Sequence, residues 1–130
     1  MNPKELQELA KYRIVKSRET FNEVKLHIAN ELWNTAVNRL YYACYYAVTA
    51  LLISKEIQPH THAGVRQMFG LHFVKKGIID NTNGKFFSDI YDLRQTGDYD
   101  DYIVFDKDDV IDLLEPANEL ITKAEGLLKK

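Results

Sequence analysis

The chain has 130 residues, 45% of them apolar, and a formal net charge of −2. This length is enough for a hydrophobic core, and we expect a single domain over residues 1–130. The one cysteine, Cys44, excludes an intrachain disulfide, and no stretch has the length and apolarity of a membrane span or a signal peptide, so we expect a cytoplasmic protein without membrane contact.

The first half of the chain has the periodicity of two long helices. The first helix is predicted from Pro3 to about Asn30, where apolar or small residues recur every three or four positions. The second begins near Trp33 and ends before Pro59. It is apolar around most of its circumference and rich in tyrosine, which favours a place at the centre of a bundle.

The second half predicts three further helices. Thr61 is a good N-cap for a helix that runs to about Lys76, with Gly77 as its stop. Residues 81–84 (Asn-Thr-Asn-Gly) are predicted to form a turn, followed by a fourth helix that ends near Gly97. An acidic connection over residues 98–106 leads to the last helix.

The last helix begins with a sequence typical of a capping box, Asp106 and Asp109, and Pro116 is expected to kink or break it. No segment has the alternation of a strand. The sequence therefore predicts an all-α protein, an antiparallel up-and-down helix bundle of four to five helices.

Charge is distributed unevenly along the chain. Residues 1–76 carry 11 Lys and Arg against 6 Asp and Glu, whereas residues 77–130 carry 6 against 13. One interpretation is that basic early helices pack beside acidic late ones, within one chain or across a dimer. The other is a small basic patch for RNA or a nucleotide phosphate, although binding dominated by phosphates would favour a larger basic surplus.

Three short segments carry a resemblance to a known family. They are Asn-Arg-Leu-Tyr-Tyr-Ala (38–43), Thr-His-Ala-Gly-Val (61–65) and Arg-Gln-Thr-Gly-Asp-Tyr (94–99). In this order and spacing the chain resembles the HEPN family, the higher-eukaryote and prokaryote nucleotide-binding domains, especially its short stand-alone prokaryotic branch. The resemblance covers essentially the whole chain and implies a bundle that often dimerises. It also implies a minimal nucleotidyltransferase as partner, because such pairs are commonly encoded together and many act as toxin and antitoxin.

The resemblance also implies a site. Active members are metal-independent ribonucleases that use an arginine followed a turn or more later by a histidine, and the arginine corresponds to Arg94. No histidine follows His72 in this chain, and Tyr99 lies in the region where the family's histidine is expected. Imidazole can move a 2′-hydroxyl proton near neutral pH, whereas a tyrosine with a pKa near 10 is a poor substitute. We therefore expect an interaction module that pairs with the transferase, with a metal-independent RNA endonuclease at a dimer groove and a nucleotide-binding regulator as alternatives.

The candidate site residues each have a structural and a functional interpretation. Arg94, Tyr99 and His62 are the catalytic candidates, with His62 either a general base brought near Arg94 by folding or a neutral, hydrogen-bonded histidine. Arg39 either forms a structural ion pair with Asp98 or binds phosphate together with Arg94. Arg94 and Asp98, four residues apart, could also pair on one helix.

No metal or cofactor is expected. His60 and His62 lack a third ligand nearby, and the acidic segment after Gly97 lacks the central glycine and terminal glutamate of a calcium loop. The resemblance adds one expectation for this segment, because some related toxin domains carry a tyrosine there that the partner transferase modifies with adenylyl groups. Tyr99 and Tyr102 are the candidates for that modification.

Overall fold

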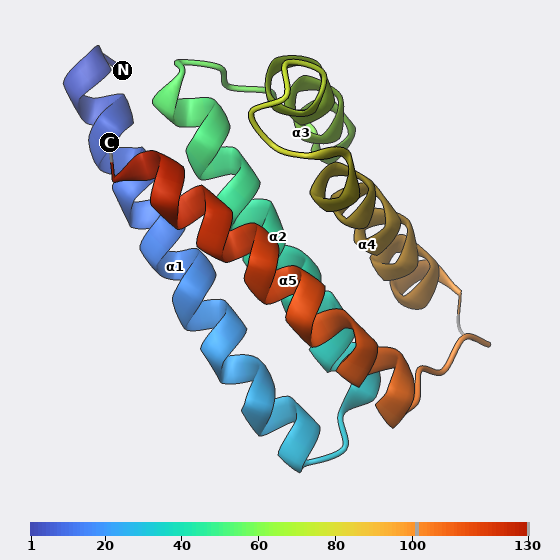
Figure 1. The fold of residues 1–130 in the computed structure, drawn as a ribbon. Coiled ribbons are helices and arrows are strands. Elements are labelled where there is room, and N and C mark those ends of the chain that lie inside the picture. The colour runs from blue at the N-terminus through green and yellow to red at the C-terminus, as the bar shows by residue number, and fades with distance from the viewer. Residues whose placement is uncertain (101, 130) are drawn as a thin grey trace.

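The computed structural model describes residues 1–100 and 102–129, which form an all-α bundle. The elements in chain order are α1 (Pro3–Ala29), α2 (Trp33–Ser54), α3 (His62–Phe69), the π-helical segment η1 (Gly70–Val74), α4 (Asn81–Tyr99) and α5 (Lys107–Leu128). The predicted fold class is confirmed. In Figure 1, α1, α2 and α5 run alongside one another, and α3 and α4 pack on the other side of α2.

The core is built around α2, which contacts α1, α3, α4 and α5. Its buried residues cover most of its circumference, as the sequence predicts, and Tyr41 and Cys44 are fully buried. Burial raises the pKa of the Cys44 thiol, so this thiol is a packing group. Each large apolar side chain buried in this way contributes about 1.5–3 kcal/mol.

The predicted turn over residues 81–84 is wrong, because α4 begins there. The Asp80 carboxylate caps the helix: its Oδ1 accepts hydrogen bonds from the backbone N–H of Asn83 at 2.9 Å and from the Asn83 side-chain amide at 2.8 Å. Gly84 lies inside the helix against Val74, and a Cβ at this position would lie 2.6 Å from Val74 Cγ2. The glycine therefore allows a close helix approach and does not form a turn.

Other element boundaries differ in smaller ways. The α-helical part of the predicted third helix ends at Phe69, and the chain continues as the π-helical segment η1. Gly77 (φ +74°) follows as the predicted stop. The fourth helix ends at Tyr99, close to the end predicted near Gly97, and Asp101 in the acidic connection lies outside the described residues.

The last helix begins as predicted. The Asp106 and Asp109 side chains each accept the other residue's backbone N–H at 2.9 Å, which is a complete capping box. Pro116 lies inside α5 without breaking it. None of the helices in the described ranges is long and apolar enough to cross a membrane.

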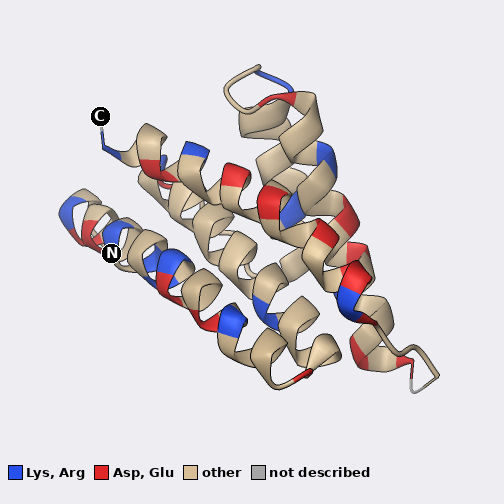
Figure 2. Ribbon diagram, turned by 60° about the horizontal axis from the view of Figure 1, so that its bottom comes forward, with Lys and Arg blue, Asp and Glu red and all other residues tan. Residues whose placement is uncertain are grey.

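Ion pairs join the basic and acidic halves of the chain. Arg18 on α1 contacts Glu125 on α5 at 2.6 Å, and Arg66 on α3 contacts Asp92 on α4 at 3.0 Å. Figure 2 shows Lys and Arg along α1, interspersed with acidic residues, and acidic residues around the α4–α5 connection. The first pair places basic α1 against acidic α5 within one chain, as one of the two interpretations predicts.

Candidate functional site

Arg94 lies at the centre of a polar cluster between α2 and α4. Its Nε lies 2.8 Å from Asp98 Oδ2, an ion pair whose N–H direction is not aligned for a hydrogen bond. Its Nη2 donates to the Tyr42 hydroxyl at 3.0 Å. The guanidinium also lies 5.3 Å from the ring centroid of Tyr41 and 5.2 Å from that of Tyr42. With these contacts only 12% of the Arg94 side chain is exposed.

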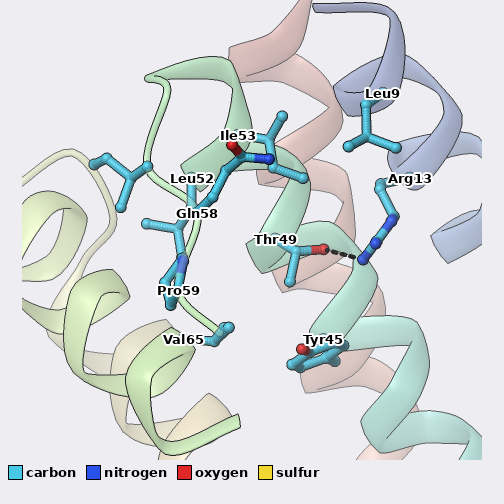
Figure 3. Close-up of a pocket in the computed structure, with 10 residues that line it drawn as sticks. Leu9, Arg13, Tyr45, Thr49, Leu52, Ile53, Gln58, Pro59 and Val65 are labelled. Carbon is cyan, nitrogen blue, oxygen red and sulfur yellow. Dashed lines mark hydrogen bonds between the residues drawn. The ribbon is translucent and has the colours of Figure 1, made fainter. Parts of the chain in front are cut away.

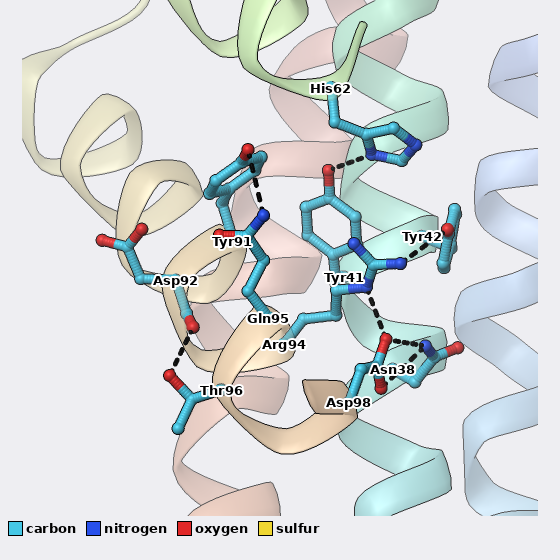
Figure 4. A network of polar contacts seen from close by, with 10 residues as sticks. All are labelled: Asn38, Tyr41, Tyr42, His62, Tyr91, Asp92, Arg94, Gln95, Thr96 and Asp98. Atoms are coloured by element: carbon cyan, nitrogen blue, oxygen red, sulfur yellow. Dashed lines mark hydrogen bonds and ion pairs between the residues drawn. The ribbon is translucent and has the colours of Figure 1, made fainter. Parts of the chain in front are cut away.

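Asp98 links this cluster to the start of α2. The Asn38 side-chain amide donates to Asp98 Oδ2 at 3.1 Å, with Oδ1 at 3.4 Å (Figure 4). One carboxylate therefore holds Arg94 on its own helix and Asn38 on the neighbouring helix. Of the two partners that the sequence predicts for Asp98, the one found is Arg94, one helical turn away on the same helix, which confirms the pair expected from their spacing. The predicted ion pair between Asp98 and Arg39 is wrong.

Arg39 lies instead beside the aromatic part of the cluster. It is half-buried, and its guanidinium lies 5.2 Å from the centroid of the Tyr42 ring. Tyr42 thus has the guanidinium groups of both Arg39 and Arg94 near its ring. Arg39 and Arg94, the two predicted phosphate ligands, therefore both lie against the Tyr42 ring, and their binding of phosphate stays a prediction.

His62, the first residue of α3, completes the cluster. Its Nδ1 lies 2.8 Å from the Tyr41 hydroxyl, and its ring stacks on Tyr45 with centroids 4.3 Å apart and planes 14° apart. Burial, and secondarily the positive charge of Arg94, lower the pKa of His62 below its ordinary value. The imidazole is therefore neutral at neutral pH, and Figure 4 shows it above Tyr41 while Arg94 lies beside the same ring.

The tautomer of His62 decides what the cluster can do. If Nδ1 carries the proton and donates to the Tyr41 oxygen, Nε2 is a free acceptor that can act as a base. If the Tyr41 hydroxyl donates to Nδ1, Nε2 carries the proton and is only a donor. Burial raises the pKa of Tyr41, so its hydroxyl stays protonated and the two arrangements differ only in the direction of this hydrogen bond.

Tyr99 differs from these groups in its exposure to solvent. It is the last residue of α4, 77% exposed, whereas Arg94 is largely covered. Tyr102, in the following connection, is 94% exposed. The residues that folding assembles with Arg94 are thus His62, Asn38 and the tyrosines of α2, while Tyr99 and Tyr102 are open to solvent.

Tyr41, Tyr42 and Asn38 are site residues that the sequence analysis did not assign to the site. The available signal was their position in the same six-residue segment as Arg39 and the rule that a buried tyrosine needs a partner for its hydroxyl. Within residues 1–100 and 102–129, no group of three or more His, Cys, Asp and Glu is placed to hold a metal ion. The groups that this cluster offers for chemistry are the Arg94 guanidinium, the His62 imidazole, the Asp98 carboxylate and the hydroxyls of Tyr41 and Tyr42.

Comparisons with known proteins identify the family of the chain. A family model for the HEPN domain matches residues 10–127. A UPF0332 protein of Thermotoga maritima is 36% identical over 129 residues, which cover 99% of this chain and 96% of that protein. "Putative toxin MJ0142" of Methanocaldococcus jannaschii is 33% identical over 117 residues (89% and 80% of the two chains), and "Putative toxin MJ0605" of the same organism is 38% identical over 96 residues (74% and 72%). The helix bundle, the residues matched and these relatives together show that the chain belongs to the HEPN domain family.

Proposed function

We propose that this chain is the toxin-like HEPN component of a two-component module, acting as a homodimer whose partner is a minimal nucleotidyltransferase. The names of the two Methanocaldococcus relatives support the toxin-like assignment. The observation that carries the pairing is the exposure of Tyr99 and Tyr102 directly after the Arg94 cluster. An enzyme that modifies a tyrosine needs its hydroxyl in solvent, and these two tyrosines are far more exposed than those of α2.

The proposed modification is adenylylation by the transferase with ATP. A tyrosine oxygen forms a bond to the α-phosphorus, the bond from that phosphorus to the bridging oxygen breaks, pyrophosphate leaves and the hydroxyl proton passes to a base of the transferase. The product carries a new negative charge next to the acidic end of α4, where Asp98 and Asp100 already lie. A modified Tyr99 would carry this charge one residue from Asp98, the ion-pair partner of Arg94.

Co-purification with a transferase encoded in an adjacent reading frame tests the proposal. The complex is incubated with ATP and the mass of each tyrosine peptide is measured, for the wild type and for Tyr99→Phe and Tyr102→Phe. Tyr12→Phe is the matched control, because Tyr12 is exposed on α1, away from this segment. We expect mass gain at Tyr99, Tyr102 or both, unchanged in the control. Failure to form a complex, or a complex without mass gain at either tyrosine, contradicts the proposal.

A second candidate function is a metal-independent RNA endonuclease. It is favoured by one observation, the meeting of His62 and Arg94 around Tyr41, because His62 supplies the imidazole that is absent after Arg94 in the sequence. In this mechanism Nε2 of neutral His62 accepts the 2′-hydroxyl proton and the 2′-oxygen forms a bond to the adjacent phosphorus. The bond from that phosphorus to the 5′-oxygen breaks, and the 5′-oxygen takes up a proton from water. Arg94 stabilises the charge that develops on the phosphate oxygens.

RNA cleavage in EDTA distinguishes the two candidates. The wild-type protein is compared with Arg94→Ala and His62→Gln, after each is shown to be folded by circular dichroism. Cleavage that both variants lose supports the endonuclease. An exposed pair on α4, Lys85 and Asp89, offers Lys85→Ala as the control for loss of one positive charge. Absence of cleavage by the folded wild-type dimer leaves the binding module as the function.

A further inference from the structure

A small cavity lies between α1, α2 and the connection from α2 to α3. Its volume is about 120 Å³, and its polar lining consists of Arg13, Tyr45, Thr49 and Gln58, while the remaining lining residues are aliphatic (Figure 3). Pockets for drug-sized ligands measure about 300–1,000 Å³. This cavity therefore has room for one small polar group and not for a nucleoside.

The charge of Arg13 has no carboxylate against it among the described residues. The hydrogen bond found for Arg13 runs from Nη1 to the Thr49 hydroxyl, at 3.3 Å, and that hydroxyl donates in turn to the Tyr46 carbonyl at 2.9 Å. Among the described residues, Arg18, Arg66 and Arg94 each form an ion pair, whereas Arg39, like Arg13, has none. A half-buried guanidinium has five donors, and most of those of Arg13 remain available for an anion.

The neighbours of Arg13 on α1 do not supply the missing charge. The residues one turn away on either side are Leu9, Ala10, Lys16 and Ser17, none of them acidic. Lys16 adds a second positive charge, with its ammonium 4.9 Å from the centroid of the Tyr46 ring. Two cations one turn apart thus face the tyrosines of α2.

Tyr45 connects this cavity to the Arg94 cluster. Arg13 is close enough to Tyr45 to oppose, through its charge, the effect of burial, which raises the pKa of the Tyr45 hydroxyl. The ring of the same tyrosine stacks on His62 at 4.3 Å. A ligand group in the cavity would therefore be one aromatic ring away from His62.

We infer that the Arg13 cavity binds one phosphate group, from a free nucleotide or from an RNA backbone. The planar fork of Arg13 matches two phosphate oxygens, and Tyr45 and Gln58 can donate to the others. The rest of the ligand lies outside the cavity and along the face that carries His62. This site does not depend on a transferase partner.

Binding measurements on the purified full chain test the site. The probes are inorganic phosphate, ATP and a short fluorescein-labelled single-stranded RNA, each titrated at low and moderate salt. Arg13→Gln removes the guanidinium, and Tyr45→Phe removes only a hydroxyl while keeping the ring against His62. Lys11→Gln is the matched control, since Lys11 is an exposed cation on the same helix that lines a different groove.

We expect Arg13→Gln to weaken binding by about tenfold and Tyr45→Phe by a few-fold, as for the loss of a charge-assisted and of a neutral hydrogen bond. Lys11→Gln should change the affinity by less than about twofold, because its charge is screened. Arg13-dependent binding of phosphate and ATP but not RNA identifies a free nucleotide as the source, and Arg13-dependent RNA binding identifies the backbone. Equal affinities for Arg13→Gln and Lys11→Gln, or no binding of any probe by the folded wild type, overturn the inference, whatever the outcome of transferase co-purification.

Discussion

At the scale of single residues, Arg94 is held by groups from two helices, and this determines what its loss should cost. Replacing it with leucine keeps a long apolar stem but leaves the Asp98 carboxylate and the Tyr42 hydroxyl without their guanidinium. We expect Arg94→Leu to lower the free energy of unfolding by about 2 kcal/mol, because charge-assisted and cation–π contacts are lost from a largely covered site. Urea denaturation followed by circular dichroism measures this loss.

The control for Arg94 is a cation in a solvent-exposed pair. Lys85 pairs with Asp89 at 2.8 Å on the surface of the same helix. Lys85→Leu should change the free energy of unfolding by less than about 0.5 kcal/mol, since such pairs contribute little. Equal losses for the two variants would mean that the contacts of Arg94 stabilise the fold no more than an exposed ion pair does.

His62 should make stability depend on pH in a defined direction. Its folded-state pKa is lowered by burial and then by Arg94, so on acidification the unfolded chain takes up this proton before the folded chain does. The contribution of neutral His62 is therefore full above its ordinary pKa of about 6.5 and decreases as the pH falls through the window below that value. The imidazole resonances of His62 should titrate below pH 6.5 by NMR.

The variant His62→Gln isolates this effect. The difference in free energy of unfolding between wild type and variant should shrink as the pH falls below about 6.5, the ordinary histidine pKa. Because the other titrating groups are common to both proteins, their contributions cancel in the difference. A difference that grows on acidification would show that His62 gains a carboxylate partner, contrary to the observed contacts with Tyr41 and Tyr45.

At the scale of helices, two glycines inside helices should respond oppositely to the same substitution. A Cβ at Gly84 of α4 would meet two methyl groups of Val74, at 2.6 and 2.9 Å, whereas nothing lies within 4 Å of one at Gly126 of α5. We expect Gly84→Ala to destabilise by about 1–2 kcal/mol through overpacking and Gly126→Ala to stabilise by about 0.5–1 kcal/mol through helix propensity. Thermal unfolding compares the two.

The variant Val74→Ala tests whether the clash with Val74 causes the loss of stability expected for Gly84→Ala. If the clash with Val74 is the reason, adding Val74→Ala to Gly84→Ala should recover part of the loss, so that the two substitutions are less costly together than their sum. Additive losses would place the cost of Gly84→Ala elsewhere in α4.

The same glycine shows why the sequence misplaced the start of α4. Asn-Thr-Asn-Gly has the composition of a turn, and nothing local reveals that Val74, ten residues earlier, requires a residue without a side chain at Gly84. The sequence also does not reveal Asp80 as an N-cap, because a predicted turn over residues 81–84 leaves no helix start next to Asp80. The Asp106 capping box, by contrast, was predictable since all of its groups lie within four residues.

At the scale of the whole molecule, the bundle followed from helix periodicity alone, and the site did not. Long helices with apolar stripes have few ways to bury them, and α2, which is apolar around most of its circumference, fits the central position. The partner of Asp98 is different, because Arg39 and Arg94 are both within reach of an aspartate by topology. The spacing of four residues allows the pair with Arg94, but whether Arg39 reaches Asp98 instead depends on side-chain direction, which a sequence pattern does not define.

The long-range pairing of the two charged halves gives the last prediction. Arg18 and Glu125 are 107 positions apart and join α1 to α5 with a bidentate contact, at 2.6 Å (Nη2–Oε1) and 3.2 Å (Nε–Oε2). A double-mutant cycle with Arg18→Met and Glu125→Gln should give a coupling energy of about 1 kcal/mol, because bidentate geometry and partial burial exceed the worth of an exposed pair. The coupling should decrease in high salt. A coupling indistinguishable from that of Lys85 and Asp89 would mean that the Arg18–Glu125 pair stabilises the fold no more than an exposed pair does, and that apolar packing holds α1 against α5.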